Sequence, residues 1–249
     1  MASRSAIETY LNNLLDVNRF RDYGPNGLQV EGKGEIVRLV SAVTASRALI
    51  EAAIEQGADT ILVHHGLFWR GQDGRVTGWL KQRLELLLRH EINLFAFHLP
   101  LDAHAQWGNN AQFGARLGLE ADARFGEQDV GFIGNLADAC EVNALANQVG
   151  ALLRRSPTLV TGDGRPVRRV AWCTGGAQGY FEAAIAAGAD AFITGEISEP
   201  QAHYARESGV AYLACGHHAS ERFGAPALGA HLAETFDLQH SVIEIDNPA

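Results

Sequence analysis

Two stretches of this sequence, Leu49 to His65 (LIEAAIEQGADTILVHH) and Tyr180 to Glu196 (YFEAAIAAGADAFITGE), align without a gap. They share Glu-Ala-Ala-Ile and Gly-Ala-Asp at the same places. Each stretch predicts a helix, a glycine turn and a following apolar strand. The repeated pattern indicates an internal duplication. The alternative is that two helix-to-strand turns converged on similar residues.

The segments around the first stretch predict a β-α-β unit. An apolar run at 37–43 comes before the helical segment at 48–56, and the apolar run at 60–63 follows it. Such units build mostly parallel sheets, so the predicted fold class is α/β with two duplicated lobes. The chain opens with an amphipathic helix, for which Ser5 and Glu8 offer a capping box.

Composition restricts the possible partners. The formal net charge is −9, and no cluster of Lys and Arg interrupts the acidic balance, so a nucleic acid is a poor candidate and a small molecule is the better one. Cys140, Cys173 and Cys215 lie far apart, which predicts reduced, buried thiols. The chain has no signal-peptide pattern and no apolar run long enough to span a membrane. We therefore expect a cytoplasmic protein.

Histidines follow the predicted strands. His64 and His65 end the run that closes with Val63, and ligands bind at the carboxyl ends of parallel strands. Because adjacent side chains on a strand point in different directions, this pair could serve two metal ions more easily than it could chelate one. The two histidines predict a dinuclear centre.

Two further histidines follow apolar runs at 92–97 and 210–215, and each has an acid four residues later. On a helix this spacing places both side chains on one face. A carboxylate can also bridge two cations. Ligation by imidazole and carboxylate without thiolate suits Fe, Zn, Mn or Ni. We predict two divalent ions per subunit, with these ligands: His64, His65, His98, Asp102, His217 and Glu221.

Two metal ions that share a water suggest hydrolytic chemistry. Glu196, which the repeat aligns with His65, is the candidate catalytic residue: it could act as the general base beside that water or contact a metal ligand without binding the metal. The alternative is that Glu196 is a solvent-exposed acid that follows a turn and has no role in catalysis. The other histidines are expected to lie in loops, on helix surfaces or, for His218, next to a predicted ligand without binding the metal. They are His90, His104, His203, His218, His231 and His240. The glycine-rich segment 175–179 is predicted to be a tight turn, and neither a serine nucleophile elbow nor a P-loop is present.

Seven short segments resemble the family of GTP cyclohydrolase I type 2 homologues, over nearly the whole chain: Tyr23–Val30, Val43–Ser46, Val63–Gly66, His98–Asp102, Gly108–Asn110, Thr194–Glu196 and Gly216–Glu221. The resemblance implies two interlinked lobes, which we place at 1–125 and 126–249, with the metal site in the cleft between them. It also implies a toroidal homohexamer with a pair of metals facing the central cavity. Carried over position by position, the family's metal ligands fall on the same six residues.

Family resemblance does not by itself specify a reaction. One hypothesis is metal-dependent hydrolysis of the purine ring of GTP or of another nucleotide-like substrate. The other is a non-catalytic metal-binding ring that stores or delivers ions, or scaffolds partner proteins. Direct handling of DNA is disfavoured by the acidic charge.

Overall fold

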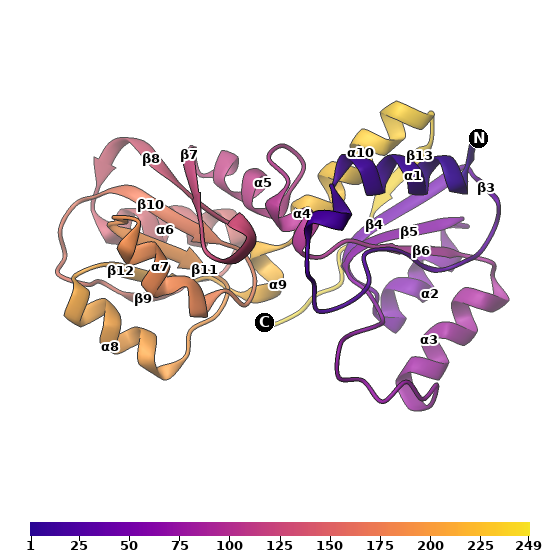
Figure 1. The fold of residues 1–249 in the computed structure, drawn as a ribbon, viewed down its shortest axis with the longest axis horizontal. Helices are drawn as coiled ribbons and strands as arrows, with labels where there is room; N and C mark the ends of the chain where they lie inside the picture. Colours follow the sequence, from indigo (N-terminus) through magenta and orange to yellow (C-terminus); the bar gives the residue numbers. More distant parts are fainter. The chain divides into compact units, whose positions relative to one another are not determined.

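The chain forms two α/β units, each built on one mixed sheet, in a computed structural model that describes residues 1–249 (Figure 1). The first unit comprises Met1–Leu101 and Gly224–Asp246, and the second comprises Asp102–Phe223 and Asn247–Ala249. These bounds differ from the predicted lobes 1–125 and 126–249. The reason is that α10 (Gly224–Phe236) and β13 (Gln239–Val242) return to the first sheet, where β13 pairs with β4 (Arg38–Thr44).

In the first unit the strand order is β13-β4-β5-β6-β2. Strands β13, β4, β5 (Thr60–His65) and β6 (Asn93–Ala96) run parallel, and β2 (Gly27–Val30) is an antiparallel edge strand. Strand residues alternate between two apolar faces. Val40, Ile61 and Leu94 belong to the core that includes residues of α2 (Arg47–Glu55) and α3 (Gly78–Arg89). Leu39, Leu62 and Phe95 meet side chains of α1 (Arg4–Leu14) and α10.

In the second unit the strand order is β7-β8-β10-β11-β12-β9. The central strands β10 (Val167–Cys173), β11 (Ala191–Thr194) and β12 (Ala211–Ala214) are parallel. Strands β7 (Glu120–Phe125), β8 (Gly131–Cys140) and β9 (Thr158–Val160) pair in antiparallel fashion. The longer helices of this unit are α5 (Asn109–Arg116), α6 (Val142–Leu153), α7 (Phe181–Ala186) and α8 (Glu199–Ser208). With the first unit, this sheet confirms the predicted α/β class.

The two aligned stretches have the same hydrogen bonds. Asp59 Oδ2 accepts the backbone N–H groups of Val37 and Arg38, and Asp190 Oδ2 accepts those of Arg168 and Arg169. In both units the helix ends at a glycine of positive φ, which is +66° at Gly57 and +80° at Gly188. A glycine costs little in this conformation. The shared turn, bonded in the same way, supports the inferred duplication.

The first helix differs in one detail from the prediction. It begins at Arg4 with Ser3 as its N-cap, so Ser5 lies inside α1 and the predicted capping box is wrong. The remaining elements are short: β1 (Ala2–Ser3), β3 (Glu35–Ile36), α4 (Leu99–Ala103), α9 (His217–Ser220) and three 3₁₀ turns at Val17–Arg19, Glu127–Asp129 and Gln178–Tyr180. None of the helices has the length and apolar character needed to cross a membrane.

Candidate metal centre

Three of the predicted ligands come together in the first unit, at the carboxyl ends of β5 and β6. His64 and His65 are the last residues of β5, and His98 is the second residue after the end of β6. These two strands are parallel neighbours, so their ends meet at one edge of the sheet. The candidate ligand atoms of the three histidines lie within 4.8 Å of one another, a separation that one metal ion can bridge.

The backbone and a hydroxyl group orient the two histidines of β5. His64 is fully buried, and its Nδ1 lies 2.9 Å from the carbonyl oxygen of Phe97. His65 Nδ1 lies 3.2 Å from Thr44 Oγ1, on the neighbouring strand β4. In metal sites a histidine commonly uses one ring nitrogen for such a bond and the other for the metal. In both residues, therefore, Nε2 is the nitrogen suited to a metal.

A carboxylate holds His98 in the same way. His98 Nδ1 lies 2.7 Å from Asp22 Oδ1, and Asp22 Oδ2 accepts the backbone N–H of Leu99. Asn26 accepts the backbone N–H of His98 at 2.7 Å. Burial alone would raise the pKa of Asp22, but the hydrogen bond and the charge of His98 lower it below its ordinary value. Asp22 is thus an ionised partner of His98.

Sequence reasoning missed Asp22. It lies one residue before the segment Tyr23–Val30, whereas Asn26 lies inside that segment. Its position next to a segment shared with the family was the only signal in the sequence.

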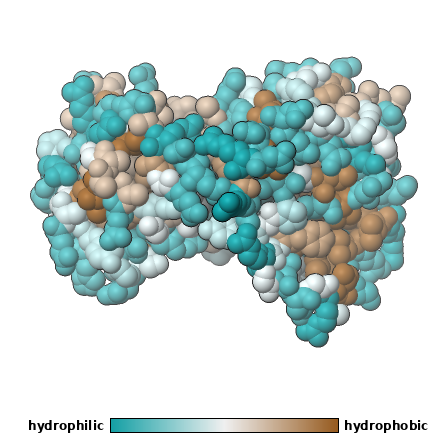
Figure 2. All heavy atoms as spheres, in the orientation of Figure 1, coloured by the Kyte–Doolittle hydropathy of each residue, from teal (hydrophilic) through white to brown (hydrophobic).

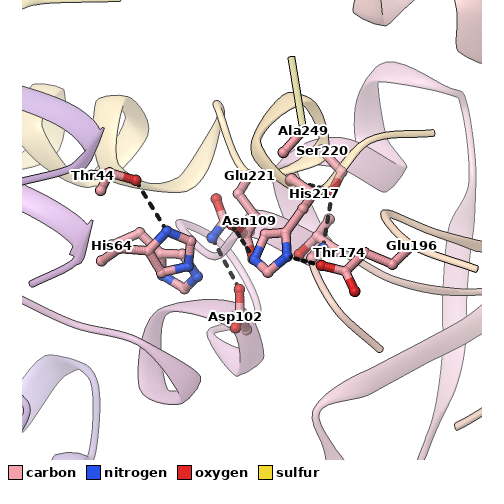
Figure 3. A network of polar contacts seen from close by, with 12 residues as sticks. Thr44, His64, Asp102, Asn109, Thr174, Glu196, His217, Ser220, Glu221 and Ala249 are labelled. Carbon is pink, nitrogen blue, oxygen red and sulfur yellow. Dashed lines mark hydrogen bonds and ion pairs between the residues drawn. The ribbon is translucent and has the colours of Figure 1, made fainter. Parts of the chain in front are cut away.

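The other three predicted ligands lie in the second unit. His217 opens α9 and Glu221 follows it, so the spacing of four brings His217 Nε2 to 3.3 Å from Glu221 Oε2. On the other side of the ring, Nδ1 lies 2.6 Å from Glu196 Oε1 (Figure 3). The hydrogen bond to Glu221, and then that to Glu196, raises the pKa of His217 to about 9. A metal at Nε2 would replace the proton there.

Two buried carboxylates accompany His217. Asp102 is 5% exposed and Glu221 is 2% exposed, and their candidate ligand oxygens lie within 4.8 Å of each other. Asn109 Nδ2 donates to Asp102 Oδ1 at 2.9 Å (Figure 3). Buried carboxylates are costly unless a partner or a metal compensates for their charge. This pair therefore fits a divalent cation.

The groups of candidate metal ligands contain no cysteine. Burial, followed by the carboxylates of Asp102 and Glu221, raises the pKa of the Cys173 thiol far above its ordinary value. All three cysteines are free, as expected, although Cys140 is only partly buried. The candidate ligands of this site are therefore imidazole and carboxylate groups.

Glu196 uses both of its carboxylate oxygens. Oε1 bonds His217, and Oε2 accepts Gln178 Nε2 at 3.0 Å. This arrangement suits a residue that orients His217, and the catalytic role of Glu196 stays a prediction.

The glycine-rich segment bends at Gly175 and Gly176, before the 3₁₀ turn at Gln178–Tyr180, and this bend leaves room for the Glu221 side chain. Gly175 has φ +72°, and a Cβ atom there would overlap the Glu221 carboxylate. Its N–H donates to Ser220 Oγ at 3.0 Å. The turn thereby lets Glu221 lie against the backbone.

Four of the six histidines given structural or neighbouring roles bond ordinary partners away from the candidate ligands. His104 Nδ1 accepts two backbone N–H groups of its own turn, from Gln106 and Trp107. His203 pairs with Glu199 one turn away on α8. Of the others, His231 bonds Tyr10, His240 bonds Ser41, His90 is the C-cap of α3, and His218 is buried in α9 next to His217.

Comparisons with known proteins agree over the full length of the chain. A protein of Neisseria meningitidis serogroup A, named GTP cyclohydrolase 1 type 2 homolog, is 49% identical over 249 residues and is covered completely, as is this chain. A solved structure described as protein ybgI, of unknown function, is 44% identical, with full coverage of both chains and a TM-score of 0.96. A crystal structure of a protein from Thermus thermophilus is 33% identical, again with full coverage and a TM-score of 0.90.

These likenesses confirm the resemblance that the seven short segments indicated. A model of the Duf34/NIF3 family matches residues 2–248. The chain belongs to the Duf34/NIF3 (NGG1p interacting factor 3) family.

Proposed function

We propose that this protein is a metal-dependent hydrolase that binds two divalent cations and acts on a nucleotide-like substrate. The observation that carries the proposal is the orientation of the histidines: Nδ1 of His64, His65 and His98 each has a partner, so Nε2 is the nitrogen directed to a metal. The proposed ligands are His64, His65 and His98 of the first unit and Asp102, His217 and Glu221 of the second.

The metal ions, when bound, would lower the pKa of a coordinated water and polarise the bond to be hydrolysed. The protein's own residues would position this chemistry. Asp22 holds Nδ1 of His98, and Glu196 holds Nδ1 of His217. Asn109 fixes one oxygen of Asp102. Orienting contacts of this kind keep the ligands in place before the metal arrives.

The substrate class rests on the relatives. The curated relatives carry the name GTP cyclohydrolase 1 type 2 homolog, which points to hydrolytic opening of a purine ring. We extend this to nucleotide-like substrates as a class, because a shared fold does not fix the substrate. We also propose the homohexameric ring that the family resemblance implies.

A second candidate function is a metal-binding ring that stores or delivers ions, or scaffolds partner proteins, without turnover. One observation favours it: both oxygens of Glu196, the predicted base, are already hydrogen-bonded, to His217 and Gln178. A general base needs a lone pair directed at the water.

The first experiment is elemental mass spectrometry of the purified protein, with the variants His64→Ala and Glu221→Ala, one from each unit. We expect about two divalent ions per chain, as in a two-metal site, and a loss of metal in both variants. His203→Ala removes an exposed histidine of α8 and serves as the control. Metal content that is unchanged in both ligand variants would refute the site.

The two functions are then separated with the metal-loaded protein. Hydrolysis of members of a nucleotide panel, lost in Asp102→Ala, supports the hydrolase. Transfer of metal to an acceptor chelator, with no turnover on the whole panel, supports storage or delivery and contradicts the hydrolase.

A further inference from the structure

We infer that Tyr23 and Trp69 form a binding platform for a planar heteroaromatic ring beside the histidines of the first unit. This inference rests on the proposed function, and it names which feature of the substrate the protein contacts. Both residues lie outside the set of metal ligands, and both belong to the unit that contains His98.

Tyr23 is an exposed aromatic side chain placed against the partly buried ring of His98. Its exposed fraction is 56%, and its ring centroid lies 6.0 Å from that of His98, with an interplanar angle of 71°. Its backbone is held on both sides: Tyr23 N–H donates to Asp22 Oδ1, and Tyr23 O accepts the N–H of Arg70 at 2.6 Å. The ring is therefore presented by a fixed backbone, although few core contacts bury it.

Trp69 lies beside the same histidine. Its ring centroid is 5.2 Å from that of His98, at an interplanar angle of 88°, and 5.9 Å from that of His65. The backbone of the Tyr23 segment lies close to it, because a Cβ atom at Gly24 would overlap the carbonyl oxygen of Phe68 and contact the Trp69 ring at 3.5 Å. Trp69 also lines a small pocket of the first unit together with His64, His98 and Phe68.

Such an arrangement suits a flat aromatic ligand. Aromatic rings attract one another at centroid separations of about 4.5 to 7 Å, the range in which Tyr23 and Trp69 already lie from the histidines. A ring stacked on either residue would therefore lie beside the imidazole of His98. Stacking does not require one particular nucleobase, because every nucleobase has a π-face.

A positive charge lies next to the platform. Arg70 is exposed, and its guanidinium donates to the carbonyl oxygen of Asp22 at 2.8 Å. In a chain with a net charge of −9, a cation beside an exposed aromatic ring favours an anionic aromatic ligand. The chemical class is thus a phosphorylated heteroaromatic ring.

The test is calorimetric titration of the metal-loaded protein with guanosine 5′-monophosphate and with ribose 5-phosphate, which lacks the base. We expect the nucleotide to bind at least about tenfold more tightly, the effect of one stacked base. Tyr23→Ala and Trp69→Leu should weaken nucleotide binding by about five- to tenfold and leave ribose 5-phosphate unchanged. Tyr23→Phe, which keeps the ring, should retain the affinity.

Trp79→Leu is the matched control, because Trp79 is an exposed tryptophan of the same unit on α3. Equal affinity for the two probes, or nucleotide binding unchanged in Tyr23→Ala, would overturn the inference even if Trp69→Leu failed to fold. Metal analysis of the same samples separates the two proposals. Protein without metal contradicts the proposed function, whereas metal-loaded protein that does not prefer the nucleotide contradicts only the platform.

Discussion

Asp22 shows how a single residue can matter for a metal site without being a ligand. We expect Asp22→Asn to weaken metal affinity by about 10- to 100-fold, because the amide keeps the shape of the carboxylate but not the charge that holds His98 Nδ1. Competition with a chromogenic chelator measures this affinity. Asp73→Asn is the control, since Asp73 is an exposed acid of the same unit that pairs with Arg75. Equal affinities in both variants would show that Asp22 has only a structural role.

A second prediction at the residue scale concerns the room around Glu221. Gly175→Ala should lower the metal content, because the added methyl group overlaps the Glu221 carboxylate at a backbone φ of +72°. The left-handed conformation should also cost about 1–2 kcal/mol of unfolding free energy. Metal analysis and urea unfolding measure the two effects. Gly179→Ala, at a glycine with open space and no positive φ, should change neither, and full metal content in Gly175→Ala would contradict the account.

At the scale of elements, the sequence best predicted the helices and strands whose pattern lies within their own residues. The periodicity of 37–63 identified β4, α2 and β5, and the repeat identified α7 and β11 in the second unit. Strands β7, β8 and β9 were missed: β7, for example, reads EADARF and most of its residues are exposed, so no alternation indicates a strand. Its conformation is set by its pairing with β8, which local sequence does not encode.

The same limit applies to the candidate site. The pairs His98 with Asp102 and His217 with Glu221 lie four residues apart, so their spacing could be recognised. Asp22 lies 76 residues from His98 along the chain, and only the fold brings them together. Residues that orient ligands are therefore harder to predict from one sequence than the ligands themselves.

The repeated helix-to-strand turn makes a testable contribution to stability. Asp59 accepts the N–H groups of Val37 and Arg38 and pairs with Lys33 at 2.8 Å. Burial would raise its pKa, but these hydrogen bonds lower it below the ordinary 3.8. We expect Asp59→Asn to lower the free energy of unfolding by about 1–3 kcal/mol near neutral pH, which is the usual cost of removing a buried hydrogen-bond partner.

The pH dependence of this effect has a definite sign. Because the folded pKa is depressed, the contribution of Asp59 is complete above pH 3.8 and is lost as the pH falls below it. Urea unfolding of the wild type and the variant should thus converge in acid. Asp246→Asn, at an exposed acid of the same unit, is the control. A difference that stays constant below pH 3.8 would contradict the ionised state of Asp59.

For the whole molecule, the sequence predicted two duplicated units but not how the chain is shared between them. A single boundary near residue 125 is what local patterns suggest. The chain instead leaves the first unit after Leu101 and re-enters it at Gly224, and the polar strand β13 (QHSV) pairs with β4, about two hundred residues earlier. Long-range parallel pairing of this kind leaves no periodic signal in the short strand itself.

The proposed ring makes the last prediction. Light scattering should give about six times the mass of one chain, 26.8 kDa. Apolar side chains gather on part of the first unit's surface (Figure 2). Val76 and Leu88 are two apolar residues of this unit with more than half of their surface exposed. Exposed apolar patches mark protein contacts. Leu88→Glu should therefore reduce the assembly mass, whereas Lys81→Glu, which adds the same acid to α3 without removing an apolar side chain, should not. A wild type that scatters as a single chain would refute the ring, and an unchanged hexamer in Leu88→Glu would place its contacts elsewhere on the surface.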